Sequence, residues 1–147
     1  MHVVIAMGSN LGERQATLDN AVSKMSSFCT SMKVSSYIET DPVGGPEQPI
    51  YLNAVVVCET ELTPHDLLKA LQAIEDEAGR TREVRWGART LDLDLITYGQ
   101  LMSDDPDLLL PHPRAHERRF VLAPWNEVDS NAHLPGIGKV SDLLNSL

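Results

Sequence analysis

The sequence contains no apolar run near the roughly 18 residues that a membrane-spanning helix requires. Its first residues, 1–4, also lack the basic segment followed by an apolar stretch that marks a secretory signal. Cysteine is scarce, and Cys29 and Cys58 stand in no Cys-x-x-Cys or other zinc-ligand spacing. We therefore expect a cytoplasmic protein whose thiols are reduced and buried, with no disulfide and no zinc site.

Positive charge is also in short supply, with 12 Lys and Arg against 21 Asp and Glu, a formal charge of −9. A field of this sign repels nucleic-acid phosphates, so nucleic acid is not an expected partner. The sequence lacks both Gly-x-x-x-x-Gly-Lys-Ser/Thr and Gly-x-Gly-x-x-Gly, which argues against a P-loop NTPase and a Rossmann fold. Any phosphate group would then have to be bound by side chains.

What the chain does contain suits a single domain. Its 147 residues are 42% hydrophobic and 22% charged, enough apolar material for one core. No internal repeat, low-complexity segment or long linker divides the sequence. We therefore predict one domain over residues 1–147.

Hydrophobic spacing predicts a simple order of elements. Strands are expected over 2–7, 33–40, 51–60 and 91–98, and helices over 13–28 and 63–79. Segment 41–49 contains three Pro and two Gly and is predicted to be a loop. This order predicts a ferredoxin-like α+β sandwich, βαββαβ, with an antiparallel sheet, helices on one face and a C-terminal extension.

The sharpest chemical signal is Leu91-Asp92-Leu93-Asp94-Leu95. Strict alternation places the leucines on the core face and both carboxylates on the other face, about 7 Å apart. Such a pair suits Mg²⁺, which proteins hold through one or two carboxylates together with substrate phosphates. The alternative is a strand with a solvated polar face. Asp is a poor strand former and like charges repel, so a bound cation is the better explanation.

Four arginines, at positions 80, 82, 85 and 89, directly precede this pair. The planar fork of arginine binds phosphate oxygens in pairs. Gly79 and Gly87 flank or interrupt the segment and predict a loop, which on its own could be merely a solvated charged loop. Beside two carboxylates, however, the cluster predicts a site for a polyphosphate with its metal.

Further candidates lie elsewhere in the chain. The basic segment LPHPRAHERRFVL contains His112, Arg118 and Phe120, and we expect some of its residues to contact an anionic substrate. Tyr51 shares a predicted strand face with Asn53, whose amide can donate to and accept from a heterocycle. A strand tyrosine is more often a core residue, so both interpretations of Tyr51 stay open. No Ser-His-Asp or Cys-His arrangement is evident, which favours direct transfer between bound substrates.

Two other classes of protein fit less well. An RNA-binding module of this fold would need a basic face and paired aromatic residues, whereas only 5% of the chain is aromatic and its charge is −9. A structural or adaptor domain would leave the arginine cluster and the aspartate pair without a role.

Four separated segments resemble one enzyme family. They are GSNLG, DPVGGPEQPIYLNAVV, IEDEAGRTREVRWGARTLDLDL and LPHPRAHERRFVLAP. Over roughly residues 1–127 the chain is similar to the 6-hydroxymethyl-7,8-dihydropterin pyrophosphokinases of folate biosynthesis. One departure is Ala88, where the family usually has proline.

The resemblance implies transfer of pyrophosphate from ATP to the hydroxymethyl oxygen of the pterin, with release of AMP. It implies two Mg²⁺ ions on Asp92 and Asp94, which with Arg80 and Arg89 would be catalytic. The implied ATP contacts are Leu68, Glu75, Arg80, Arg82, Trp86, Arg89, His112 and Arg118. The implied pterin contacts are Thr40, Pro42, Val43, Tyr51, Asn53, Trp86 and Phe120. The partners implied are these small substrates. The charge and the lack of long apolar runs argue against nucleic acid and membrane, and a monomer is expected.

Overall fold

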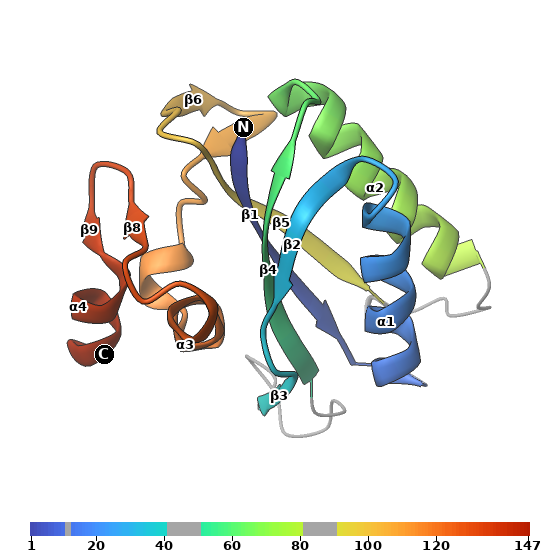
Figure 1. The fold of residues 1–147 in the computed structure, drawn as a ribbon, viewed down its shortest axis with the longest axis horizontal. Helices are drawn as coiled ribbons and strands as arrows, with labels where there is room; N and C mark the ends of the chain where they lie inside the picture. Colours follow the sequence, from blue (N-terminus) through green and yellow to red (C-terminus); the bar gives the residue numbers. More distant parts are fainter. Residues whose placement is uncertain (11–12, 41–50, 81–90) are drawn as a thin grey trace.

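The computed structural model describes residues 1–10, 13–40, 51–80 and 91–147 (Figure 1). Its helices are α1 (Arg14–Met25), α2 (Pro64–Arg80), α3 (Arg119–Val128) and α4 (Val140–Asn145), with a 3-10 turn at Ala115–Glu117. Its strands are β1 (His2–Ser9), β2 (Cys29–Val34), β3 (Ile38–Thr40), β4 (Tyr51–Thr60), β5 (Asp92–Tyr98), β6 (Ser103–Asp105), β7 (Leu108–Leu110), β8 (His133–Leu134) and β9 (Gly138–Lys139).

The main sheet is five-stranded and antiparallel, in the order β2-β4-β1-β5, with β3 also paired to β4. β1 lies inside the sheet, paired with β4 on one side and β5 on the other, and its residues 3–9 are therefore all buried. This agrees with the apolar run at the start of the chain. β5 lies at one end of the described strand order. The predicted ferredoxin-like α+β sandwich is confirmed.

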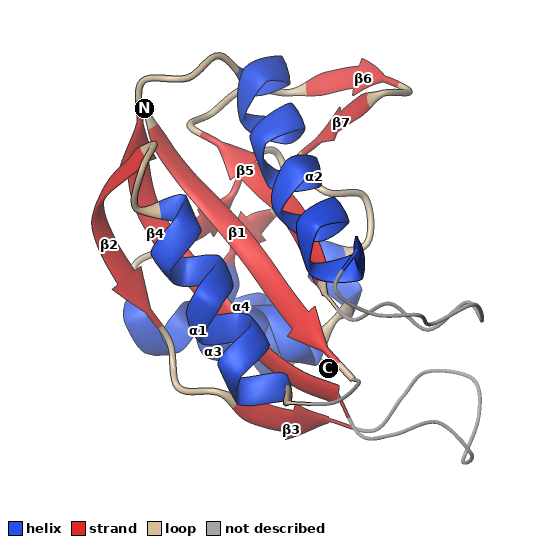
Figure 2. Ribbon diagram, turned by 90° about the vertical axis from the view of Figure 1, so that its right-hand side faces the viewer, coloured by secondary structure: helices blue, strands red, loops and turns tan. Residues whose placement is uncertain are grey.

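Each face of the sheet has its own hydrophobic core. Helices α1 and α2 cover one face, and α3 and α4 lie on the other (Figures 1 and 2). The first core includes Leu93 and Leu95 of β5 and both free cysteines, Cys29 and Cys58. The second includes Val4 of β1 and Trp125 of α3, which is 2% exposed. Alternation along β1 and β5 therefore divides their side chains between the two cores.

Two predicted elements differ from their expected bounds by more than two residues. Helix α1 ends at Met25, and the hydroxyls of Ser26 and Ser27 bond to the carbonyls of Ser23 and Lys24. Such local bonds compete with helix continuation. The strand expected over 33–40 is divided into β2 and β3. Around the division, Ser35 donates its N–H to the carbonyl of Val55 and accepts the Val55 N–H on its hydroxyl.

The N-terminus of α2 agrees with its sequence signal. Thr63 accepts the backbone N–H of Asp66 on its hydroxyl at 3.2 Å, which caps the helix beginning at Pro64. Among the described helices, none is both long and apolar enough to cross a membrane.

Candidate active site

A cavity of about 440 Å³ opens on the same side of the sheet as the α3 core. Its floor comes from β1, β4 and β5, and Thr40 of β3 also lines it. Its wall comes from Arg114, Glu117, Arg118, Arg119 and Phe120, at and just before the start of α3. The cavity therefore joins the first half of the chain to the C-terminal extension.

One cross-strand row forms the centre of the floor. Gly8 of β1 is opposite Asn53 of β4 on one side and Asp92 of β5 on the other. A Cβ placed on Gly8 would lie 2.9 Å from Asn53 Oδ1, closer than real Cβ contacts allow. The missing side chain of Gly8 is thus what lets the Asn53 amide lie over β1.

Asn53 is held in this position by its neighbours. It is 6% exposed, and its Nδ2 donates a hydrogen bond to Thr40 Oγ1. Tyr51 lies on the same face of β4 and also lines the cavity. Burial raises the pKa of the Tyr51 phenol, and the negative charge of Asp92 raises it further. The phenol is therefore neutral at pH 7, and the floor offers an amide beside an aromatic ring.

The two aspartates also face the cavity. Asp92 and Asp94 are partly buried, whereas Leu93 between them packs in the opposite core. Arg118 Nη1 lies 3.9 Å from Asp94 Oδ2, and the Arg118 guanidinium carbon is 5.5 Å from the centre of the Phe120 ring. Arginine thus meets both a carboxylate and an aromatic face at one edge of the cavity.

The carboxylate pair fits Mg²⁺ in its donor chemistry. Within the described ranges no group of three or more His, Cys, Asp or Glu could hold a metal ion. Magnesium needs only one or two protein carboxylates when substrate phosphates complete its shell. Asp92 and Asp94 supply hard oxygen donors beside a cavity that has room for such a substrate.

His112 lies at the side of this site. Burial lowers its pKa most; the charge of Asp94 opposes this, while Arg118 and Arg114 lower it further. The backbone N–H of Arg114 donates to His112 Nδ1 at 3.2 Å. Because Nδ1 accepts this bond, the neutral ring carries its proton on Nε2 and can donate it.

The structure brings together most of the described residues predicted from the sequence. Those that line the cavity are Thr40, Tyr51, Asn53, Asp92, Asp94, Arg118 and Phe120. Three of the described predicted residues do not line it. Leu68 packs against the α1/α2 core, Glu75 bonds to β5, and His112 lies beside the cavity with its backbone N–H bonded to Ile96 of β5. Pro42, Val43, Arg82, Trp86 and Arg89 lie outside the described residues, as does the side chain of Arg80.

The cavity also has residues that the sequence interpretation did not assign to it. Gly8 and Ala6 belong to its floor, and Arg114, Glu117 and Arg119 to its wall. The period of two along β1 could have indicated Gly8 and Ala6, but only with the strand register known. Arg114 and Arg119 were visible as basic residues beside His112 and Arg118.

Asn10, two residues after Gly8, is a further unassigned polar group. It is 1% exposed, and neither of its amide atoms has a hydrogen-bond partner in the part of the chain that the structure describes. A buried unpaired amide is costly and frequently marks a functional position.

Comparisons with known proteins point to one enzyme family. The family model for 7,8-dihydro-6-hydroxymethylpterin-pyrophosphokinase (HPPK) matches residues 4–130. The 2-amino-4-hydroxy-6-hydroxymethyldihydropteridine pyrophosphokinase of Bacillus subtilis is 48% identical over 126 residues, covering 84% of this chain and 75% of its own. The enzyme of that name from Haemophilus influenzae is 42% identical over 142 residues, covering 95% and 89%.

A solved structure supports the fold independently. The crystal structure of a Plasmodium falciparum HPPK-DHPS with pteroate superposes with a TM-score of 0.72 at 11% identity. The match covers 99% of this chain and 42% of that longer one, and at this identity it bears on the fold alone. The family match and the bacterial relatives settle the classification: the chain belongs to the 7,8-dihydro-6-hydroxymethylpterin-pyrophosphokinase family.

Proposed function

We propose that the cavity over β1, β4 and β5 is where this chain carries out the reaction of its family. That reaction is transfer of pyrophosphate from ATP to the hydroxyl of 6-hydroxymethyl-7,8-dihydropterin, in folate biosynthesis. The observation that carries the proposal is the row Asn53–Gly8–Asp92. It sets a buried amide and a carboxylate on opposite sides of Gly8, both on the floor of one cavity.

The pterin is proposed to lie over β4. Asn53 would read its donor and acceptor edge, since a buried amide can do both. Tyr51 and Phe120 would stack on its ring, and both line the cavity from different elements, β4 and α3. Thr40 supports this arrangement by bonding the Asn53 amide.

The triphosphate is proposed to lie over β5 and the start of α3. Asp92 and Asp94 would hold two Mg²⁺ ions, which when bound neutralise phosphate charge and polarise the transferring group. Arg118 is 3.9 Å from Asp94, a loose pairing that leaves its other donors available for phosphate oxygens. His112 would donate from Nε2.

Catalysis in this arrangement is mainly positioning and electrostatics. Phosphoryl-type transition states leave little covalent work for the protein. The neutral Tyr51 phenol is no base at pH 7, because both burial and Asp92 raise its pKa. What these side chains do is orient two substrates and offset the charge that develops between them.

Other roles in the proposal have sequence resemblance as their support. These are the catalytic and ATP contacts of Arg80, Arg82, Arg89 and Trp86, the adenosine contacts of Leu68 and Glu75, and the pterin contacts of Pro42 and Val43. Length, composition and charge support the further proposals of a single domain over 1–147, a cytoplasmic location and the absence of nucleic-acid partners. A monomeric state is also proposed.

Phosphorus NMR tests the site assignment. The protein is incubated with MgATP and the hydroxymethyl dihydropterin, and AMP and the dihydropterin diphosphate are followed. Asp92→Asn and Asp94→Asn should nearly abolish both products, while Asp104→Asn, an exposed carboxylate of β6, should leave them unchanged. Full activity of either cavity variant at limiting Mg²⁺ would overturn the assignment.

A further inference from the structure

The outer edge of β5 is bonded by groups from outside the sheet. On this edge the N–H of Leu93 donates to Glu75 Oε2 of α2 at 2.8 Å, and the carbonyl of Ile96 accepts the N–H of His112 at 2.9 Å. Edge strands present backbone groups that the sheet itself cannot pair. Glu75 and His112 thus provide hydrogen-bond partners for backbone groups of β5, the strand that carries Asp92 and Asp94.

The hydrogen bond to Glu75 involves the residue of β5 that separates the two aspartates. Leu93 stands between Asp92 and Asp94, and its side chain is 4% exposed in the core beneath α2. The N–H that Glu75 accepts belongs to the peptide plane joining Asp92 to Leu93. The direction of that plane sets where the Asp92 side chain leaves the strand and how far it stands from Asp94.

Helix α2 is itself well anchored at this position. Leu71 and Ile74, on the turn that leads to Glu75, are 0% and 6% exposed in the core. The Glu75 side chain is only partly buried, and its carboxylate makes a charge-assisted bond. A fixed helix therefore positions the backbone of an edge strand through a short hydrogen bond.

We propose that Glu75 is a positioning residue for the divalent-cation site, acting through the Leu93 amide on the spacing of Asp92 and Asp94. The inference rests on the proposed function, because it takes these two aspartates as the cation ligands. It gives Glu75 a role different from the adenosine contact implied by the resemblance. Glu75 does not line the cavity, and its carboxylate accepts the N–H of Leu93 in β5.

Residues that orient metal ligands have a measurable effect on metal affinity. Changing a group that orients a ligand typically lowers metal affinity by about tenfold to a hundredfold. Glu75→Ala removes the acceptor, and Glu75→Asp withdraws it by one methylene. Glu75→Gln keeps an oxygen at the same reach without the charge. Positioning therefore predicts that Gln rescues and Asp does not.

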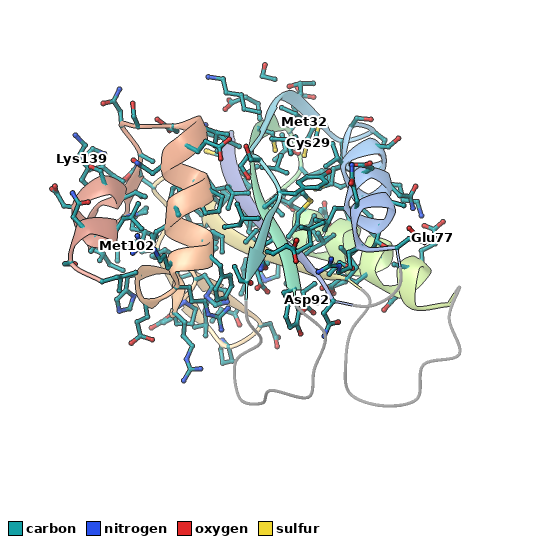
Figure 3. The ribbon with its side chains drawn as sticks, turned by 90° about the horizontal axis from the view of Figure 1, so that it is seen from below. Cys29, Met32, Glu77, Asp92, Met102 and Lys139 are labelled. Atoms are coloured by element: carbon teal, nitrogen blue, oxygen red, sulfur yellow. The ribbon has the colours of Figure 1, made fainter. Side chains whose placement is uncertain are left out.

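The first measurement uses the free protein. Hydrogen exchange of the Leu93 amide, followed by NMR, should accelerate about tenfold or more in Glu75→Ala and Glu75→Asp and stay near wild type in Glu75→Gln. Glu77→Ala is the matched control, since Glu77 is an exposed carboxylate of the same helix that pairs with Lys24 of α1 at 2.9 Å. Figure 3 shows Glu77 apart from Asp92.

The second measurement follows Mn²⁺ binding by electron paramagnetic resonance with a non-hydrolysable ATP analogue. Affinity should fall about tenfold to a hundredfold in Glu75→Ala and Glu75→Asp and remain within about threefold of wild type in Glu75→Gln and Glu77→Ala. Unchanged exchange at Leu93 or unchanged affinity in Glu75→Asp would overturn the proposal. Rescue by Asp and not by Gln would do the same, because it would indicate a role for charge.

Asp92→Asn separates this failure from failure of the proposed site. If Asp92→Asn leaves Mn²⁺ affinity unchanged, the cation-site assignment is wrong and the inference falls with it. If Asp92→Asn lowers affinity and Glu75→Asp does not, the site stands and only the positioning role is lost. A change in preference between ATP and GTP with normal Mn²⁺ affinity in Glu75→Asp would instead favour the adenosine contact.

Discussion

Replacing Gly8 with alanine tests the floor of the cavity most directly. The strand backbone at Gly8 accepts alanine, but the new Cβ would lie 2.9 Å from Asn53 Oδ1 and 3.7 Å from Tyr51 Cδ1. Because Asn53 is paired to Gly8 in the register and is 6% exposed, the amide must rotate to relieve the contact. Rotation would also strain or break its bond to Thr40.

The magnitude follows from these two losses. An off-rotamer side chain costs about 0.5–1.5 kcal/mol and a lost hydrogen bond about 0.5–1.5 kcal/mol, so Gly8→Ala should reduce the unfolding free energy by about 1–3 kcal/mol. With the amide turned away, pterin affinity should fall about tenfold to a hundredfold. ATP affinity should change little, since Asp92 and Asp94 keep their places on β5.

Calorimetric titration with each substrate and urea unfolding measure these effects. Asn53→Ala removes the oxygen that would clash with the new Cβ. In the double variant, Gly8→Ala should therefore lower the unfolding free energy little further. Gly79→Ala is a stability control, because among the described residues nothing beyond the local backbone of α2 lies within 4 Å of its Cβ position. Fully additive costs of Gly8→Ala and Asn53→Ala would refute the argument, because they would show that the two positions do not interact.

Three further changes probe the site. Asn53→Ala should raise the pterin Kd about tenfold to a hundredfold while the ATP Kd barely moves; equal losses in titration would indicate a damaged fold. Asn10→Leu should raise the melting temperature, because an unpaired buried amide is removed, but lower turnover in a steady-state assay; a lower melting temperature would contradict this. Burial lowers the pKa of His112 below its ordinary 6.5, so the folded protein binds fewer protons than the unfolded chain near that pH. The contribution of His112 to the free energy of unfolding therefore declines as pH falls through about 6.5. His112→Gln should flatten the dependence of the urea midpoint on pH in this range, and an unchanged slope would contradict the argument.

The sequence predicted those parts of the fold that local periodicity decides. The bounds expected for β4 agree with the structure, and alternation correctly placed Asp92 and Asp94 opposite the leucines of β5. The division between β2 and β3 was not predictable in this way. It depends on Ser35 bonding to Val55, a partner 20 positions along the chain.

Contacts between elements account for the other features that could not be predicted from the sequence. Nothing in α2 alone indicates that Glu75 bonds to Leu93, because that bond exists only once helix and strand are packed. Gly8 likewise gains its role from the register that sets it opposite Asn53. Helix α3 has Pro124 in its interior, a residue that argues against a helix in a local pattern.

The start of α3 has a consequence for how stability and substrate affinity vary together. The same short helix buries Trp125 in the second core and presents Phe120 to the cavity. A substitution that loosens this helix would therefore weaken the folded state and the substrate wall in one step. Conversely, a ligand that binds the wall stabilises the core behind it, and saturation at a hundred times Kd is worth about 2.7 kcal/mol. Selection for thermal tolerance and for substrate capture thus acts on one and the same segment of this chain.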